Sequence, residues 1–150
     1  MNLDVMQGAL IALVSLGGGV GIQNYNSYKR EQRDQRIAFA KDTLLDLQSA
    51  LGDMALAAEQ IRFAKREAGS WSDGQSGLPW TDLLKNAIQA SRYSVLLDDE
   101  DLQRLTEQTE NAFLRLAHAA SEVEAKAEED PARAILRQAN ARIGERVRGL

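Results

Sequence analysis

The chain has 150 residues, of which 44% are hydrophobic and 27% charged, a formal net charge of -4 and no cysteine. This length supports one domain with a modest core. The absence of cysteine excludes a disulfide framework and a zinc site built from thiolates, and a single histidine, His118, excludes any site that needs two imidazoles.

The N-terminal segment, residues 5–22, contains 18 consecutive uncharged residues. As a helix it would be about 27 Å long, close to the roughly 30 Å hydrocarbon core of a bilayer. Its Val, Leu and Ile residues favour insertion by roughly 3 to 4 kcal/mol before the polar residues and glycines reduce this gain. We therefore expect one membrane-spanning helix.

Two other interpretations of residues 5–22 stay open. A cleaved secretory signal is disfavoured because the residues before the apolar run, Met-Asn-Leu-Asp, are acidic instead of basic, and no cleavage site follows the run. A helix buried in a soluble bundle is disfavoured by the glycines at Gly17, Gly18, Gly19 and Gly21, which are poor residues for a helix interior.

The charges beside this segment predict the direction of insertion. Only Asp4 precedes it, whereas a basic cluster follows it, and basic residues accumulate on the cytoplasmic side. We therefore predict an external N-terminus, an anchor and interface at residues 1–28, and a cytoplasmic body at residues 29–150. The predicted membrane-interface residues are Tyr25, Tyr28, Lys29, Arg30, Arg33 and Arg36.

Small residues occur four positions apart twice in the predicted span, at Gly8 with Ala12 and at Gly17 with Gly21. This spacing lets two helix backbones approach closely in lipid. Glycine is also common in membrane helices in general. The pattern therefore fits either self-association through the span or composition alone.

The body begins with a long helix, predicted at residues 29–68. Its apolar residues follow a spacing of three and four, which indicates a stripe facing a partner helix or the core of a bundle. The residues proposed for this seam are Leu44, Leu47, Leu51 and Met54. Gly69 is a natural stop for the helix, and residues 69–80 read as a loop. Trp71 and Trp80 bracket the loop, either as a partner-binding pair or as anchors of its two ends.

Three further helices are predicted, at residues 81–97, 98–129 and 131–149. Thr81 and Asp98 are the expected caps of the first two, and Asp130 followed by Pro131 is the expected start of the last. In the first, Leu83, Leu84, Ala87 and Ile88 are expected to share a buried face. In the second, the expected stripe is Leu102, Leu105, Thr109, Ala112, Leu116, Ala119 and Val123, widened by Phe113 and Ala120. The last is expected to turn Ala132, Ile135, Leu136, Ala139, Ile143 and Val147 inward.

Charge is segregated along the C-terminal half. Residues 98–130 contain 11 acidic and 3 basic residues, whereas residues 131–150 contain five arginines and one glutamate. We expect the two blocks to pair as antiparallel helices, although exposed ion pairs contribute only about 0 to 1 kcal/mol each. The alternative is contact with anionic lipid. The arginines concerned are Arg133, Arg137, Arg142, Arg146 and Arg148.

No motif for catalysis or a cofactor is present in the sequence. His118 lies between alanines, as a packed or partly exposed imidazole would. The glycines at 17–21 are not followed by the Lys-Ser/Thr of a phosphate-binding loop, and there is no nucleophile elbow. The acidic body also disfavours nucleic acid. We expect neither an enzyme nor a cofactor, metal, nucleic acid or small-molecule substrate.

The sequence thus predicts an all-α protein: a single N-terminal transmembrane helix followed by an antiparallel helical bundle with a long heptad-patterned first helix. The expected function is that of a membrane-anchored scaffold whose partners are membrane lipid and either itself or another helical protein. One alternative is a small membrane-perturbing protein, such as a phage lysis component or a defence effector, that oligomerises through its glycine-rich span. A second is a soluble bundle that buries residues 5–22.

Overall fold

A computed structural model describes the backbone of residues 3–74 and 77–150, and the side chains of residues 27–74 and 77–150. This part of the chain contains four helices and no strand. They are α1 (Leu3–Glu67), α2 (Trp80–Leu96), α3 (Glu100–His118) and α4 (Glu122–Arg148). The all-helical prediction is therefore confirmed. The chain divides into two compact units, Met1–Phe39 and Ala40–Leu150.

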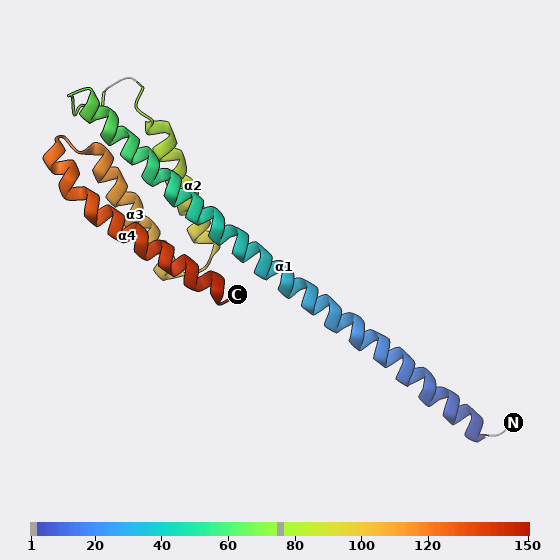
Figure 1. Ribbon diagram of the computed structural model, residues 1–150. Coiled ribbons are helices and arrows are strands. Elements are labelled where there is room, and N and C mark those ends of the chain that lie inside the picture. Colours follow the sequence, from blue (N-terminus) through green and yellow to red (C-terminus); the bar gives the residue numbers. More distant parts are fainter. Residues whose placement is uncertain (1–2, 75–76) are drawn as a thin grey trace. The chain divides into compact units, whose positions relative to one another are not determined.

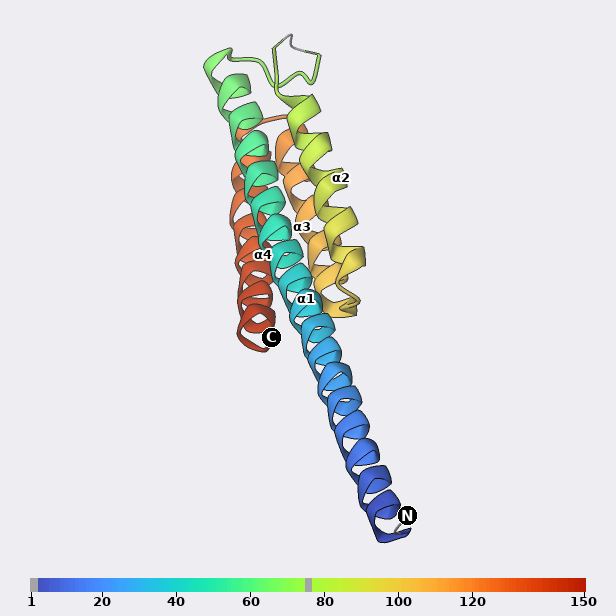
Figure 2. The ribbon, with the colours of Figure 1, turned by 90° about the vertical axis from the view of Figure 1, so that its right-hand side faces the viewer.

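The second unit is a bundle of four helices. Its members are the part of α1 that begins at Ala40, followed by α2, α3 and α4, which lie side by side with their connections at alternate ends (Figures 1 and 2). The α1–α2 loop and the α3–α4 turn therefore lie at one end of the bundle. The α2–α3 turn and the C-terminus of α4 lie at the other.

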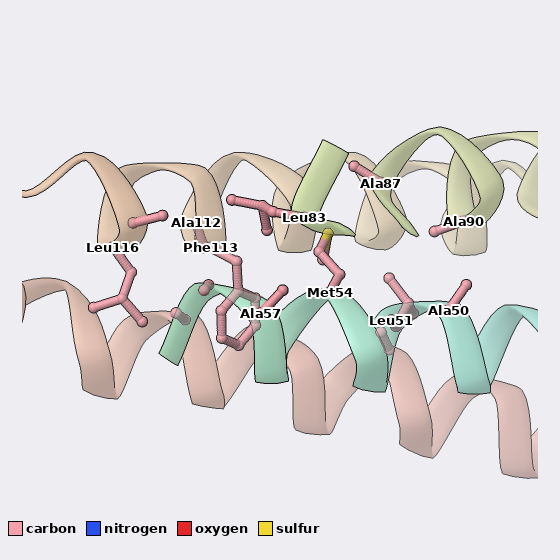
Figure 3. Close-up of a cluster of buried hydrophobic side chains, with 14 of the residues drawn as sticks. Ala50, Leu51, Met54, Ala57, Leu83, Ala87, Ala90, Ala112, Phe113 and Leu116 are labelled. Carbon is pink, nitrogen blue, oxygen red and sulfur yellow. The ribbon is translucent and has the colours of Figure 1, made fainter. Parts of the chain in front are cut away.

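The core of the bundle follows the heptad pattern of α1. The predicted seam residues Leu44, Leu47, Leu51 and Met54 are fully buried. Figure 3 shows residues of this stripe facing side chains from α2 and α3, among them Leu83 and Phe113. Many of the other core residues are alanines, which let the helix backbones approach closely. They include Ala57, Ala58, Ala87, Ala90, Ala112, Ala132 and Ala139.

The end of α1 is set by Gly69, as predicted. Gly69 adopts a φ of 61°, the left-handed region that glycine enters without steric penalty. The amide of Gly69 donates to the carbonyl of Arg66, and that of Ser70 donates to the carbonyl of Lys65. These two bonds satisfy carbonyls at the end of the helix that have no intrahelical partner, as in a Schellman motif.

The predicted boundary between the last two helices is wrong. The chain does not break at Asp130 and Pro131; it turns at residues 119–121, and Pro131 lies inside α4. At the turn, the Ser121 hydroxyl accepts a hydrogen bond from the Glu124 amide at 3.2 Å, and the Glu124 carboxylate accepts one from the Ala120 amide at 2.8 Å. Ser121 and Glu124 thus form contacts close to those of a capping box, except that the Glu124 carboxylate accepts from Ala120, the residue before the cap.

Two apolar residues are misplaced by the same error. Val123 and Ala120 were expected on the buried stripe of a helix running to residue 129, but both are exposed, Val123 to 80%. Pro131 is tolerated because it lies on the outer face of α4. Ala127, whose carbonyl would otherwise accept from residue 131, is also exposed and can be hydrated there.

The predicted caps of the other two helices are displaced, by two residues for α2 and by one residue for α3. α2 begins at Trp80 after Pro79, without a side-chain cap, so Thr81 is not its cap. Asp99, not Asp98, caps α3, and its carboxylate accepts from the Leu102 amide at 3.0 Å. Asp98 cannot be the cap because it turns the chain with a φ of 47°, whereas Asp99 has the extended backbone that a cap residue requires.

The Ser121 cap gives a test of the α3–α4 boundary. We expect Ser121→Ala to lower the free energy of unfolding by about 1 kcal/mol, because the Glu124 amide loses its acceptor. The control is Ser49→Ala, at an exposed site inside α1, where alanine should be neutral or slightly stabilising. Thermal unfolding in detergent micelles, followed by circular dichroism, measures both. Equal transitions for the two variants would contradict the assigned boundary.

Candidate functional site

The residues predicted at the membrane fall into two groups. The span residues Gly8, Ala12, Gly17 and Gly21, together with Tyr25, lie outside the residues whose side chains are described. The predicted interface residues from position 28 onward are exposed on α1. The Tyr28 hydroxyl accepts a hydrogen bond from the Gln32 side chain at 2.6 Å. Within residues 27–74 and 77–150, no helix is long and apolar enough to cross a bilayer. The predicted interface residues found exposed on α1 are Tyr28, Lys29, Arg30, Arg33 and Arg36.

The C-terminal arginines form a clamp at one end of the bundle. Arg142 and Arg146, near the end of α4, each lie within about 3 Å of the Asp99 carboxylate at the start of α3, at 3.0 and 3.1 Å. Burial raises the pKa of Asp99, but the Leu102 amide and the two arginines outweigh this effect and hold the pKa below its ordinary value. The expected pairing of the acidic and basic blocks therefore occurs here.

The other predicted lipid-contacting arginines are placed differently. Arg133 pairs with Glu59 of α1 at 2.9 Å and with Glu129 of α4 at 2.8 Å. Arg137 and Arg148 are exposed on α4. Three of the five arginines are thus engaged within the bundle, and their contact with anionic lipid stays a prediction.

A polar cluster lies at the opposite end of the bundle, centred on Lys65. The Lys65 side chain is fully buried in the last turn of α1. Its ammonium donates to the Asp73 carboxylate in the α1–α2 loop and to the Ala117 carbonyl at 2.8 Å, with the Ala119 carbonyl at 3.5 Å. Both carbonyls belong to the end of α3, where unpaired acceptors and the negative end of the helix dipole favour a cation.

Two rings complete the cluster. The His118 imidazole pairs with the other Asp73 oxygen through Nδ1 at 2.8 Å and stacks on the Trp80 indole with ring centroids 4.6 Å apart. The Lys65 ammonium lies 5.5 Å from the centroid of the same indole. Burial raises the pKa of Asp73, but the hydrogen bonds and charges of Lys65 and His118 more than offset it, so this pKa is lowered.

This cluster joins α1, the loop, α2 and α3 at one point. Lys65 directs its three donors at three acceptors, so it acts as a structural tie and has no free lone pair for chemistry. Trp71 and Trp80 are both partly buried against the core, as expected of residues that anchor the loop ends. Lys65 was missed in the sequence, although it lies four residues after Ile61 and so continues the heptad stripe of α1.

A groove lies between α2 and α3. It has a volume of about 560 Å³ and is lined on the α2 side by Ser91, Ser94 and Val95. The α3 side contributes Thr106, Glu107 and Glu110, among others. The expected buried face of α2 is half wrong: Leu83 and Ala87 are buried, but Leu84 and Ile88 point outward and are 50% and 55% exposed.

The carboxylate of Glu110 is the unusual group in this groove. One of its oxygens, Oε1, is buried and has no hydrogen-bond partner among the described residues. Burial, with a smaller contribution from the neighbouring Glu107 carboxylate, raises the pKa of Glu110 to about 7. The groove therefore holds an acceptor that the bundle itself does not satisfy.

Comparisons of the chain with models of protein families, with curated proteins and with solved structures each find no match. In the part of the chain with described side chains, no group of three or more acidic or histidine residues is arranged to hold a metal ion. Its function is therefore inferred from the chemistry of its surfaces.

The Lys65 tie predicts a large difference between two lysines. We expect Lys65→Met to lower the free energy of unfolding by about 1 to 3 kcal/mol, because it leaves the acceptors at the end of α3 and the Asp73 carboxylate without their donor. Lys85→Met, at an exposed position of α2, should change it by less than about 0.5 kcal/mol. Urea unfolding of both variants in micelles provides the measurement, and equal midpoints would refute the tie.

The raised pKa of Glu110 predicts a pH-dependent stability. Since its pKa is about 7 in the folded chain and ordinarily 4.5, the folded state binds more protons between these values, and stability falls as pH rises through them. Glu110→Gln should therefore be more stable than wild type by about 1 to 2 kcal/mol at pH 8 and nearly equal to it at pH 4. Urea unfolding across this range tests the sign, with the exposed Glu67→Gln as control. A constant difference from pH 4 to 8 would contradict it.

Proposed function

We propose that this protein is a membrane-anchored helical interaction protein whose bundle binds partners at the cytoplasmic face of the membrane. The observation that carries the proposal is the division of apolar surface in the bundle. The heptad seam of α1 is buried within the chain, so it is not available to a partner. Apolar side chains are nevertheless left exposed in rows on α1 and α2, which is typical of protein–protein contact.

These rows follow helical spacing. On α1, Leu45, Leu56 and Phe63 occupy one line on the side opposite the core, and on α2, Leu84, Ile88 and Val95 occupy another. Helices that present a row of apolar residues bind other helices by packing side chains between one another. Scattered exposed apolar residues would need no such explanation.

One observation supports an anchor at residues 5–22. The backbone of α1 is helical from Leu3, so the uncharged stretch has the helical backbone that a membrane-spanning segment requires. This stretch belongs to the unit Met1–Phe39.

The direction of the anchor is proposed from the basic residues at its C-terminal side. Lys29, Arg30, Arg33 and Arg36 are exposed on α1, where they can contact the anionic inner leaflet, whereas only Asp4 precedes the apolar stretch. We therefore propose that the bundle lies inside the cell.

Matched substitutions test the anchor. We expect the wild-type chain to resist extraction from membranes by carbonate. Leu13→Arg should release most of it, because an arginine near the centre of a span costs about 2.5 to 3.5 kcal/mol and the gross gain of insertion is only slightly larger. Leu56→Arg introduces the same charge on the exposed face of α1 in the bundle and should remain in the membrane pellet.

The same preparation tests orientation. A reporter fused after Leu150 should be cleaved by external protease only after the spheroplasts are lysed. Release of the wild-type chain by carbonate would refute the anchor, and cleavage of the reporter in intact spheroplasts would refute the direction.

A further inference from the structure

The exposed row on α2 adjoins the groove between α2 and α3. Leu84, Ile88 and Val95 are 50%, 55% and 64% exposed, and Ser91 completes their spacing of three and four residues. Ser91 and Val95 also line the groove. The row therefore meets the groove at Ser91 and Val95 and continues beyond it along α2 to Ile88 and Leu84, with a small residue, Ser91, where a side chain of a facing helix can pack.

The opposite edge of the groove is acidic. Glu107 and Glu110 line it from α3, and Glu100 lies at the end nearest the α2–α3 turn. The one cation in the lining, Arg104, is paired with Asp101 at 2.8 Å. One oxygen of the Glu110 carboxylate, Oε1, is buried and has no donor in the described chain, and Glu110 is part of the groove lining.

We propose that the groove between α2 and α3 binds an amphipathic helix of a partner protein that carries a lysine or arginine within its apolar stripe. Aliphatic residues of the partner pack on Leu84, Ile88 and Val95, and its cation donates hydrogen bonds to Glu110. The occupant forms a third helix beside α2 and α3, in the arrangement by which coiled coils and bundles take up a further member.

Charge complementarity selects this occupant over a purely apolar helix. Covering the groove with aliphatic groups alone would remove the remaining water from Glu110 and leave its carboxylate buried without a donor, which is strongly unfavourable. A cation removes that penalty and also neutralises the neighbouring Glu107. Glu110 therefore acts as a specificity element, because it penalises partners that lack the basic residue.

The exposed face of α1 provides the internal comparison. It has apolar residues of similar size at Leu45, Leu56 and Phe63, but Glu110 and its unsatisfied oxygen lie on the other side of the bundle interior, in the α2–α3 groove. Selectivity for a basic residue is thus specific to one of the two apolar faces.

The inference names the partner of the interaction role proposed above and rests on that role, but it does not need the anchor. The test is a selection from a displayed library of heptad-patterned helical peptides, about three heptads long, with one central apolar-stripe position fully randomised. The target is the full chain in detergent micelles, so the result is independent of membrane insertion. Failure here with a normal carbonate result would remove the inference and leave the anchor intact.

We expect selected peptides to carry lysine or arginine at the randomised position. Their affinity should fall by about tenfold or more for Glu110→Gln and for Ile88→Asp, and should stay unchanged for Leu56→Asp on the α1 face. Since Glu110→Gln is expected to stabilise the fold, its loss of binding would not reflect unfolding.

Three results would overturn the inference. The first is a selection without preference for a basic residue. The second is binding that survives Glu110→Gln. The third is an oligomer of the wild-type chain, measured by sedimentation, that dissociates in Ile88→Asp, because the occupant of the groove would then be a second copy of this chain.

Discussion

The bundle depends on one stripe of α1, repeated every three and four residues from Leu44 to Lys65. Six apolar residues of this stripe are buried, and the next position in the repeat is a lysine with no exposed surface. An ammonium group can occupy a core position only if each of its hydrogens finds an acceptor. The carbonyls at the end of α3 and the carboxylate of Asp73 meet that requirement, so Lys65 ties the end of α3 and the α1–α2 loop to α1.

The two ends of the bundle are therefore held by opposite arrangements of charge. At one end a buried cation is enclosed by acceptors from two other elements. At the other a nearly buried carboxylate, Asp99, caps α3 and receives Arg142 and Arg146 from α4. Both devices act on α3, whereas α2 between its two ends is held mainly by Leu83, Ala87 and Ala90. The groove lies beside this helix, at Ser91 and Val95.

The sequence predicted the helices better than it predicted their boundaries. Heptad spacing identified the buried stripe of α1 and most of the inward residues of α4, because such periodicity reflects burial directly. The Asp130-Pro131 pattern predicts a helix start at the wrong place, because a proline on the exposed face of a helix leaves only one carbonyl for water to satisfy and need not end the helix. A capping pair three residues apart was visible in the sequence and would have found the turn.

The contacts within the polar clusters could not be predicted from sequence spacing in the same way. Asp73, Trp80 and His118 meet through contacts between residues up to 45 positions apart, which no local pattern encodes. The lysine among them was at least marked by its place in the heptad repeat. For Leu84 and Ile88 the spacing on α2 was correct, but it could not tell which side of a wide apolar stripe would be covered. That choice depends on where the neighbouring helices lie.

Glu110 and the exposed row on α2 are best understood together. In an isolated bundle, each is unfavourable: burial raises the pKa of the carboxyl group to about 7, and three aliphatic side chains remain in contact with water. A glutamine and a few polar residues would serve the same fold with fewer penalties, and nothing in the packing of α2 on α3 requires the charge. Both features become favourable under one condition, the arrival of a helix that supplies apolar surface and a cation at the same place. The buried carboxylate and the exposed aliphatic row are each unfavourable in the isolated bundle, and a single basic amphipathic helix would relieve both. Binding of such a partner therefore explains the two features better than the requirements of folding do.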